Sequence, residues 1–142
     1  MDMADDEALI RFRLDANSGV PAYRQIVDQV RHAVSLGRLR PGDQLPPVRE
    51  VVTHITVNPN TVHRAYRDLE AEGLVRGEQG RGTFVLAGAT AATTPKHREE
   101  LQRELTKWLD RARDVGMDDA GIVALISVTM RDRDLERKEA TG

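Results

Sequence analysis

The sequence predicts a mainly α-helical protein with one small β-hairpin: three helices and the hairpin come first, and two further helices follow. Three observations lead to this fold class. Apolar residues recur at helical spacing in five segments. Two short runs of β-branched and aromatic residues flank a glycine-rich stretch, which is typical of a hairpin. The stretch AGATAATTP at 87–95 has the composition of a linker and separates the last two helical segments from the rest.

Composition excludes several classes of protein. The chain of 142 residues contains no Cys, so disulfides, thiolate metal sites and a Cys nucleophile are excluded. No apolar run approaches the ~18–20 residues needed to cross a bilayer. The acidic N-terminus lacks the basic and apolar regions of a signal peptide. We therefore expect a cytoplasmic protein without membrane contact.

Residues 1–19 are expected to form an acidic tail with a short strand. They carry two Arg against five acids. Within them, Ile10, Phe12 and Leu14 alternate with charged residues, which predicts a strand over 9–14. A turn at Asn17–Gly19 follows, so we place the start of the first folded domain at residue 20.

Residues 20–86 hold the three helices and the hairpin. Pro21 suits the first position of a helix, which Gly37 ends. Pro46 and Pro47 introduce a second, short helix. A third helix begins at Asn58, whose side chain is expected to accept a hydrogen bond from the backbone of Thr61. That helix has an inner stripe of Val62, Ala65, Tyr66 and Leu69 and stops at Gly73; a hairpin with its loop at 77–82 follows.

Beyond the linker at 87–95, residues 96–134 carry two more apolar helical stripes, and residues 135–142 are expected to fray. Asp118 is expected to cap the last helix. Two helices are too few to bury both stripes alone, so pairing with a second copy is expected to cover them. The residues assigned to this dimer contact are Leu101, Leu105, Trp108, Leu109, Ile122, Ile126 and Met130.

The order of two helices, a short turn between them and a following hairpin is that of a winged helix-turn-helix, whose second helix of the pair enters the DNA major groove. The outward face of the 58–72 helix carries Asn60, Arg64 and Arg67, with His63 and Thr61 beside them. Residues 20–86 hold nine Arg and no Lys against seven acids. Both features favour double-stranded DNA as the partner, because a DNA-binding protein needs a basic face.

Several stretches resemble the GntR family of bacterial transcription regulators. They are Pro21-Ala-Tyr-Arg-Gln-Ile, GRLRPGDQLPPVREV, VNPNTVHRAYRDLEAEGLV and GRGTFV, and they follow one another over residues 21–86 without large gaps. The sequence around Asn58 is similar to that of the YtrA and MocR subfamilies. A MocR-type chain needs an aminotransferase-like domain, whereas about 50 residues follow the linker here. The resemblance is therefore to the YtrA type, with its short two-helix tail.

This resemblance implies a winged helix-turn-helix and, most often, a repressor. It also implies a homodimer; by its two-fold symmetry such a dimer would bind an inverted-repeat operator. A small-molecule effector of unspecified chemistry is compatible with it. The positions that match DNA-contacting residues of the family are Arg49, Asn58, Asn60, Thr61, His63, Arg64, Gln79, Gly80 and Arg81. His63 stands where the family frequently has Arg, and Pro47 where it commonly has a capping Ser.

The same residues support other functions less well. The Gly77–Gly82 stretch lies between two strands, whereas a nucleotide-binding loop needs a strand before it and a helix after it. The four His have no metal-ligand spacing, and no catalytic set can be assembled, so we expect no cofactor, no metal and no enzymatic activity. The alternative from another class is a winged-helix protein–protein adaptor. The charged outward face disfavours it, since interface cores are depleted in charge.

Overall fold

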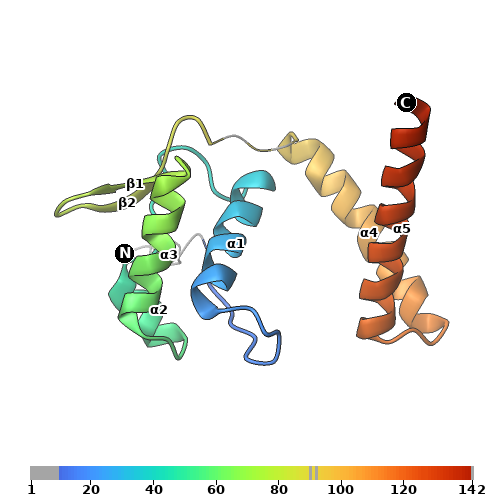
Figure 1. Cartoon of the computed structure of the whole chain (residues 1–142), viewed down its shortest axis with the longest axis horizontal. Coiled ribbons are helices and arrows are strands. Elements are labelled where there is room, and N and C mark those ends of the chain that lie inside the picture. The colour runs from blue at the N-terminus through green and yellow to red at the C-terminus, as the bar shows by residue number, and fades with distance from the viewer. Residues whose placement is uncertain (1–9, 90, 92, 142) are drawn as a thin grey trace. The chain divides into compact units, whose positions relative to one another are not determined.

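The computed structural model describes residues 10–89, 91 and 93–141. Within them the chain forms the following elements: α1 (Ala22–Ser35), α2 (Val48–His54), α3 (Pro59–Ala71), β1 (Val75–Glu78), β2 (Gly82–Val85), α4 (Pro95–Asp114) and α5 (Asp119–Thr141) (Figure 1). The predicted fold class, mainly α-helical with a single hairpin, is confirmed. The chain divides after Pro95 into two compact units. We call them the winged unit and the C-terminal unit and describe each by itself.

The winged unit is built around one hydrophobic core between α1 and α3. Ile26 and Val30 of α1 face Val62 and Leu69 of α3, and all four side chains have no exposed surface. The predicted inner stripe of α3 is confirmed, since its four members are all buried. Leu39, Leu45, Val51, Val75 and Val85 extend the same core toward α2 and the hairpin. Burial of apolar surface of this kind is the main stabilising contribution to a fold.

Asn58 caps α3 as predicted, but it does so through a different donor. Its Oδ1 accepts a hydrogen bond from the backbone N–H of Asn60 at 2.8 Å. The N–H of Thr61 donates instead to the backbone carbonyl of Asn58, at 2.9 Å. Pro59 fills the first helical position, where its missing N–H has no cost. In contrast, α2 follows Pro47 and has no side-chain cap.

The N-terminal segment differs from the prediction. Residues 10–14 form no strand. Instead the Gln29 side-chain amide of α1 pairs with Arg13 much as a neighbouring strand would: the Arg13 N–H donates to Oε1 at 2.9 Å, and its carbonyl accepts from Nε2 at 2.6 Å. Phe12 is 5% exposed and packs against Tyr66, with ring centroids 6.5 Å apart. Phe12 therefore belongs to the same hydrophobic core as α1 and α3, and Ile10 and Leu14 pack against it, although the expected folded domain begins at residue 20. The predicted acidic tail before residue 10 lies outside the described residues.

The hairpin has longer strands and a shorter loop than predicted. β1 and β2 pair in antiparallel register from Val75 with Val85 to Glu78 with Gly82, which leaves only residues 79–81 at the tip. The segment around Gln44 adds a bridge to Phe84 on the other edge of β2. Gly82 has a φ of +129°, and a Cβ there would lie 2.5 Å from Nε2 of Gln44. Glycine at this position lets the Gln44 side chain approach the hairpin backbone, where Nε2 donates to the Arg81 carbonyl at 3.2 Å.

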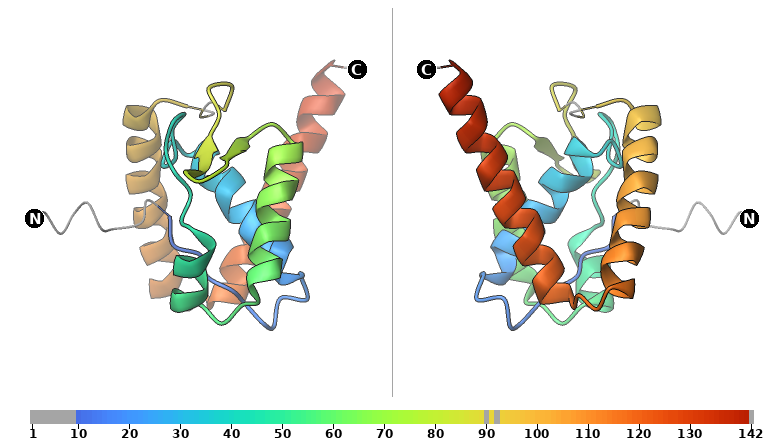
Figure 2. Two further views of the ribbon diagram at one scale, coloured as in Figure 1. Left: turned by 90° about the vertical axis from the view of Figure 1, so that its left-hand side faces the viewer. Right: turned by 90° about the vertical axis from the view of Figure 1, so that its right-hand side faces the viewer.

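The C-terminal unit consists of α4 and α5, which diverge from the turn that joins them (Figure 2). Asp118 begins α5 as predicted, accepting a hydrogen bond from the N–H of Gly121 at 2.8 Å. The predicted fraying after residue 134 is wrong, because α5 stays helical to Thr141. Arg133 with Glu136 and Arg137 with Asp134 form ion pairs at helical spacing along this stretch. Among the described residues no helix is both long and apolar enough to span a membrane.

Candidate nucleic-acid interface

A buried tyrosine links α3 to the segment that precedes α2. The Tyr66 hydroxyl donates to the carbonyl of Pro46 at 2.6 Å and so ties α3 to the residues that precede α2. Burial raises the pKa of this hydroxyl, and the negative charge of Glu50 raises it further, so it remains a donor. The two helices of the helix-turn-helix are thereby held in one arrangement, which a recognition helix needs in order to meet a groove of fixed shape.

The outward face of α3 carries polar and basic side chains. Asn60, His63, Arg64 and Arg67 are exposed, and Thr61 is half-buried. Asn58 is also exposed, but its side-chain oxygen is already engaged by the cap. The helical arc predicted from the sequence is therefore the exposed face. Free guanidinium and amide groups on such a face are suited to base edges in a major groove.

A groove runs beside this face, and three arginines reach it from three different elements. Arg49 comes from α2, Arg67 from α3 and Arg81 from the hairpin tip, and His63 also lines it. The remaining lining residues are Gln44, Leu45, Pro46, Pro47, Val48, Tyr66, Glu70, Gly82 and Thr83. Arg49 and Arg67 form no ion pair with any described residue. The groove is lined by three arginines and one carboxylate, that of Glu70, so its lining has a net positive charge.

The hairpin tip holds the candidate wing residues. Gln79, Gly80 and Arg81 are exposed. The Arg81 guanidinium pairs with Glu78 at 2.7 Å and lies 5.2 Å from the Phe84 ring centre. Within β1, the Gly77 N–H donates to the Glu70 carboxylate at 3.4 Å. These contacts connect the wing to α3 and place one basic side chain at its tip.

The structure separates the two arginines that the helical arc grouped together. Arg67 lines the groove, although the candidate set assigned from the sequence omitted it. Arg64 does not line the groove; its guanidinium lies over the ring of Tyr23 of α1, 3.8 Å from the ring centre. The sequence signal that could have identified Arg67 was its position on the outward arc of the 58–72 helix. The stacking of Arg64 on another helix had no signal in the local sequence.

A second link joins the far end of α3 to α1. Arg31 donates through Nε to the Glu72 carboxylate at 2.9 Å and through a second nitrogen to its other oxygen, and it also pairs with Asp28 at 3.3 Å. The hydrogen bond from Arg31 holds the pKa of Glu72 below its usual value. Together with the cap at Asn58, this ion pair fixes both ends of the recognition helix.

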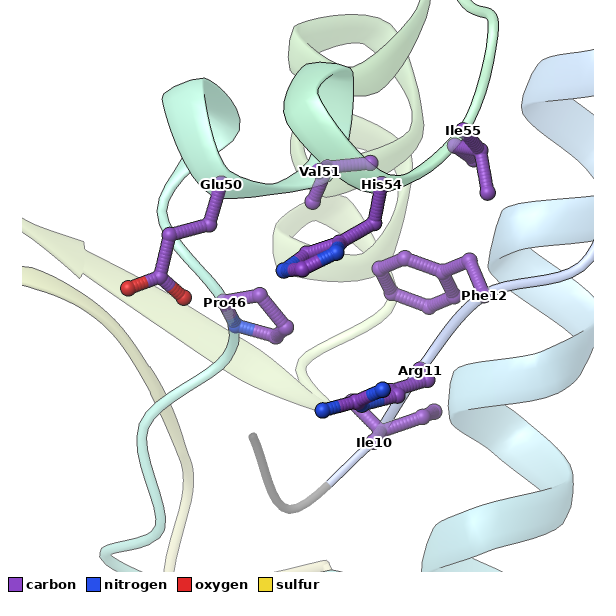
Figure 3. Close-up of a pocket in the computed structure, with 8 residues that line it drawn as sticks. All are labelled: Ile10, Arg11, Phe12, Pro46, Glu50, Val51, His54 and Ile55. Atoms are coloured by element: carbon purple, nitrogen blue, oxygen red, sulfur yellow. The ribbon is translucent and has the colours of Figure 1, made fainter. Parts of the chain in front are cut away.

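A small cavity lies between the N-terminal segment and α2 (Figure 3). The rings of Phe12, Pro46 and His54 gather around it, with Arg11 and Glu50 at its edge. Its volume of about 20 Å³ has room for about one water molecule. This space is therefore too small for an effector molecule.

The C-terminal unit exposes much of its apolar surface. Of the residues predicted to make the dimer contact, Leu101, Leu105 and Met130 are 48–63% exposed. Trp108, Leu109 and Ile126 are half-buried, whereas Ile122 is only 4% exposed and packs inside the helical pair. Five large apolar residues that the prediction omitted are also exposed: Val115, Val123, Leu125, Val128 and Leu135. Apolar side chains thus occupy several sides of the first half of α5, more than α4 alone can cover.

The winged unit and its basic groove define the class: a winged helix-turn-helix protein built to bind DNA. A family model described as bacterial regulatory proteins, gntR family, matches residues 22–85. The chain is 35% identical over 106 residues to the HTH-type transcriptional repressor YtrA of Bacillus subtilis (strain 168), covering 75% of this chain and 82% of YtrA. It is 36% identical over 101 residues to the uncharacterized regulator YhcF of the same organism, covering 70% and 82%.

A solved structure agrees with these sequence relatives. A transcriptional antiterminator from Listeria monocytogenes EGD-e matches with a TM-score of 0.56 and 29% identity, covering 88% of this chain and 93% of that one. The chain belongs to the gntR family. It is a DNA-binding transcriptional regulator of that family, and no enzymatic family is indicated.

Proposed function

We propose that the protein is a repressor that binds an inverted-repeat operator as a homodimer. The groove beside α3 carries this proposal, because Arg49, Arg67 and Arg81 converge there from the two helices and the wing. In each protomer α3 enters a major groove and the wing lies along the adjacent backbone. The similarity to YtrA, whose name describes a repressor, supports the direction of regulation.

The side chains divide into two chemical roles. The groove arginines neutralise phosphates, which supplies most of the affinity and little of the sequence preference. Asn60 and His63 are exposed on α3 and present hydrogen-bonding groups to base edges, where asparagine pairs with adenine through two hydrogen bonds. Gln79 and Gly80 at the wing tip are candidate backbone contacts.

The C-terminal unit supplies the dimer contact. The exposed apolar side chains of α4 and α5 form a surface that a monomer in water would leave unfavourably hydrated. A second copy offers the same surface, and a closed two-fold pair then presents two recognition helices in opposite orientations. This geometry is the reason for expecting an inverted repeat with half-sites on one face of the duplex.

The DNA-binding part of the proposal is tested by selecting bound duplexes from a random pool with the full chain. We expect enrichment of a two-fold symmetric sequence, and we expect the selected duplex to shift in a gel at far lower protein concentration than a scrambled duplex. A protein–protein adaptor would give no enriched sequence and no preference between the two duplexes, which would overturn the proposal.

The dimer contact is tested by placing a charge on the exposed apolar surface. Leu105→Asp and Met130→Asp should give monomers in sedimentation, because each would bury a carboxylate in the contact. Val115→Asp is the matched control: Val115 is 80% exposed in the turn after α4, and the variant should remain a dimer. A monomeric wild-type chain, or dimers in all three variants, would contradict this arrangement.

A further inference from the structure

We propose that Tyr23 of α1 is a positioning residue that holds Arg64 of α3 in the orientation in which it reads a base of the operator. The inference deepens the proposed function and rests on it, since it adds a specificity-determining pair to the α3 contact. It starts from a single geometric fact: the Arg64 guanidinium lies 3.8 Å from the centre of the Tyr23 ring. Separations below about 6 Å between a cation and an aromatic face are attractive.

Arg64 is not engaged by any carboxylate of the described residues. The nearest acid along the helix at pairing distance in sequence is Asp68, four residues further on, in the order that favours an ion pair less. Among the described residues Arg64 forms neither an ion pair nor a hydrogen bond, and its guanidinium rests on Tyr23 instead. Arg31 and Arg81, by contrast, are engaged by carboxylates. The ring of Tyr23 is thus the contact that sets the direction of the Arg64 side chain.

The ring itself is held by the core. Tyr23 is half-buried and packs against the residues between α1 and α3, and its hydroxyl makes no hydrogen bond with the described residues. Its apolar face therefore has a fixed direction, whereas a free arginine side chain samples many rotamers. Stacking on this ring restricts the rotamers of Arg64 in the free protein, so less side-chain conformational entropy is lost when Arg64 contacts DNA.

Stacking also leaves the reading groups of Arg64 available. The N–H donors of a guanidinium lie in its plane, so a ring against one face blocks none of their in-plane directions. Two of those donors can meet O6 and N7 of a guanine. Asn60 lies one helical turn before Arg64 on the exposed face, which places an adenine-reading group next to a guanine-reading one. Tyr23 then decides which base pair of the half-site the arginine addresses.

The test compares specificity profiles of full-length variants on an operator library. Arg64→Ala should lose the preference at one position of each half-site. Tyr23→Leu, which keeps apolar bulk but removes the aromatic face, should weaken the preference at that same position by roughly 2–5-fold. Tyr23→Phe keeps the face and should restore it. In the Arg64→Ala background, Tyr23→Leu should add no further loss of specificity. Leu36→Ala, an exposed apolar change at the other end of α1, is the control for general perturbation of the helix.

A measurement on the free protein makes the result decisive even if Tyr23→Leu folds poorly. The ring should shift the Arg64 side-chain protons upfield in the NMR spectrum of the wild-type chain, and Tyr23→Phe should retain the shift. Absence of this shift, or additive losses in the double variant, would overturn the inference alone. A wild-type chain that shows the shift but selects no DNA sequence would overturn the proposed function and the reading role of Arg64 with it.

Discussion

Removal of one groove arginine has a salt signature that can be worked out in advance. For duplex DNA, the slope of log binding constant against log salt is about −0.9 for each phosphate neutralised. Three groove arginines in each of two protomers would contribute a slope of about −5. Arg49→Ala in a dimer removes two such contacts, so the magnitude of the slope should fall by about 2. Arg49 pairs with no acid among the described residues, so this contribution is not reduced by a neighbouring carboxylate.

The assay is fluorescence anisotropy of a labelled operator duplex, titrated over about 50–300 mM salt. Arg67→Ala should behave as Arg49→Ala does, whereas Arg81→Ala should change the slope less, because Glu78 already compensates part of its charge. Arg38→Ala removes an exposed arginine that does not line the groove and should leave the slope unchanged. Equal slopes for the wild type, Arg49→Ala and Arg67→Ala would refute the assignment of the groove to phosphate contacts.

Three further predictions concern the stability of the recognition helix. Asn58→Ala removes the cap and should cost about 0.5–2 kcal/mol, seen as a lower melting temperature; an unchanged value would show that the cap contributes nothing. Tyr66→Phe leaves a buried carbonyl without its donor and should cost about 1–2 kcal/mol in urea unfolding, and a variant as stable as the wild type would contradict the role of the hydroxyl. Because the pKa of Glu72 is lowered on folding, its contribution is present above the unfolded value of about 4.3 and fades as the pH falls below it. Glu72→Gln should remove this acid-sensitive contribution, which is less than about 1 kcal/mol because the ion pair with Arg31 is exposed. Free energies of unfolding measured from pH 3 to 7 should therefore depend less on pH than those of the wild type, and an identical pH dependence would contradict the prediction.

The elements that could be predicted from sequence are those whose signals are local. Helical spacing of apolar residues, proline at a first helical position and an asparagine cap all act within one or two turns, and they located α1 and α3 to within a residue or two. Thr61 was the wrong partner for the cap because the choice between neighbouring backbone donors depends on the exact turn at Pro59. The continuation of α5 was missed because its end is stabilised by ion pairs one turn apart, which resemble a solvated charge run in sequence.

The contacts that could not be predicted join residues distant in the sequence. Alternation at Ile10, Phe12 and Leu14 correctly indicated one-sided burial, but the side-chain amide of Gln29 replaces the expected strand partner. The same holds for the candidate site. Helical angles placed Asn60, Arg64 and Arg67 on one exposed arc. Only the packing of α1 shows that Arg64 leans toward Tyr23 while Arg67 faces the wing.

The position of Phe12 bears on the smallest piece of this chain that can fold. The family match begins at residue 22, yet the ring that covers Tyr66 comes from ten residues earlier. A fragment cut at the family boundary would lose that ring as well as the backbone hydrogen bonds of Arg13, a loss comparable with deleting a core phenylalanine, about 3–5 kcal/mol. A small domain has little more stability than that to lose. The segment that matches the family is therefore shorter than the segment that packs into one core. A DNA-binding fragment meant to fold alone should begin no later than residue 10.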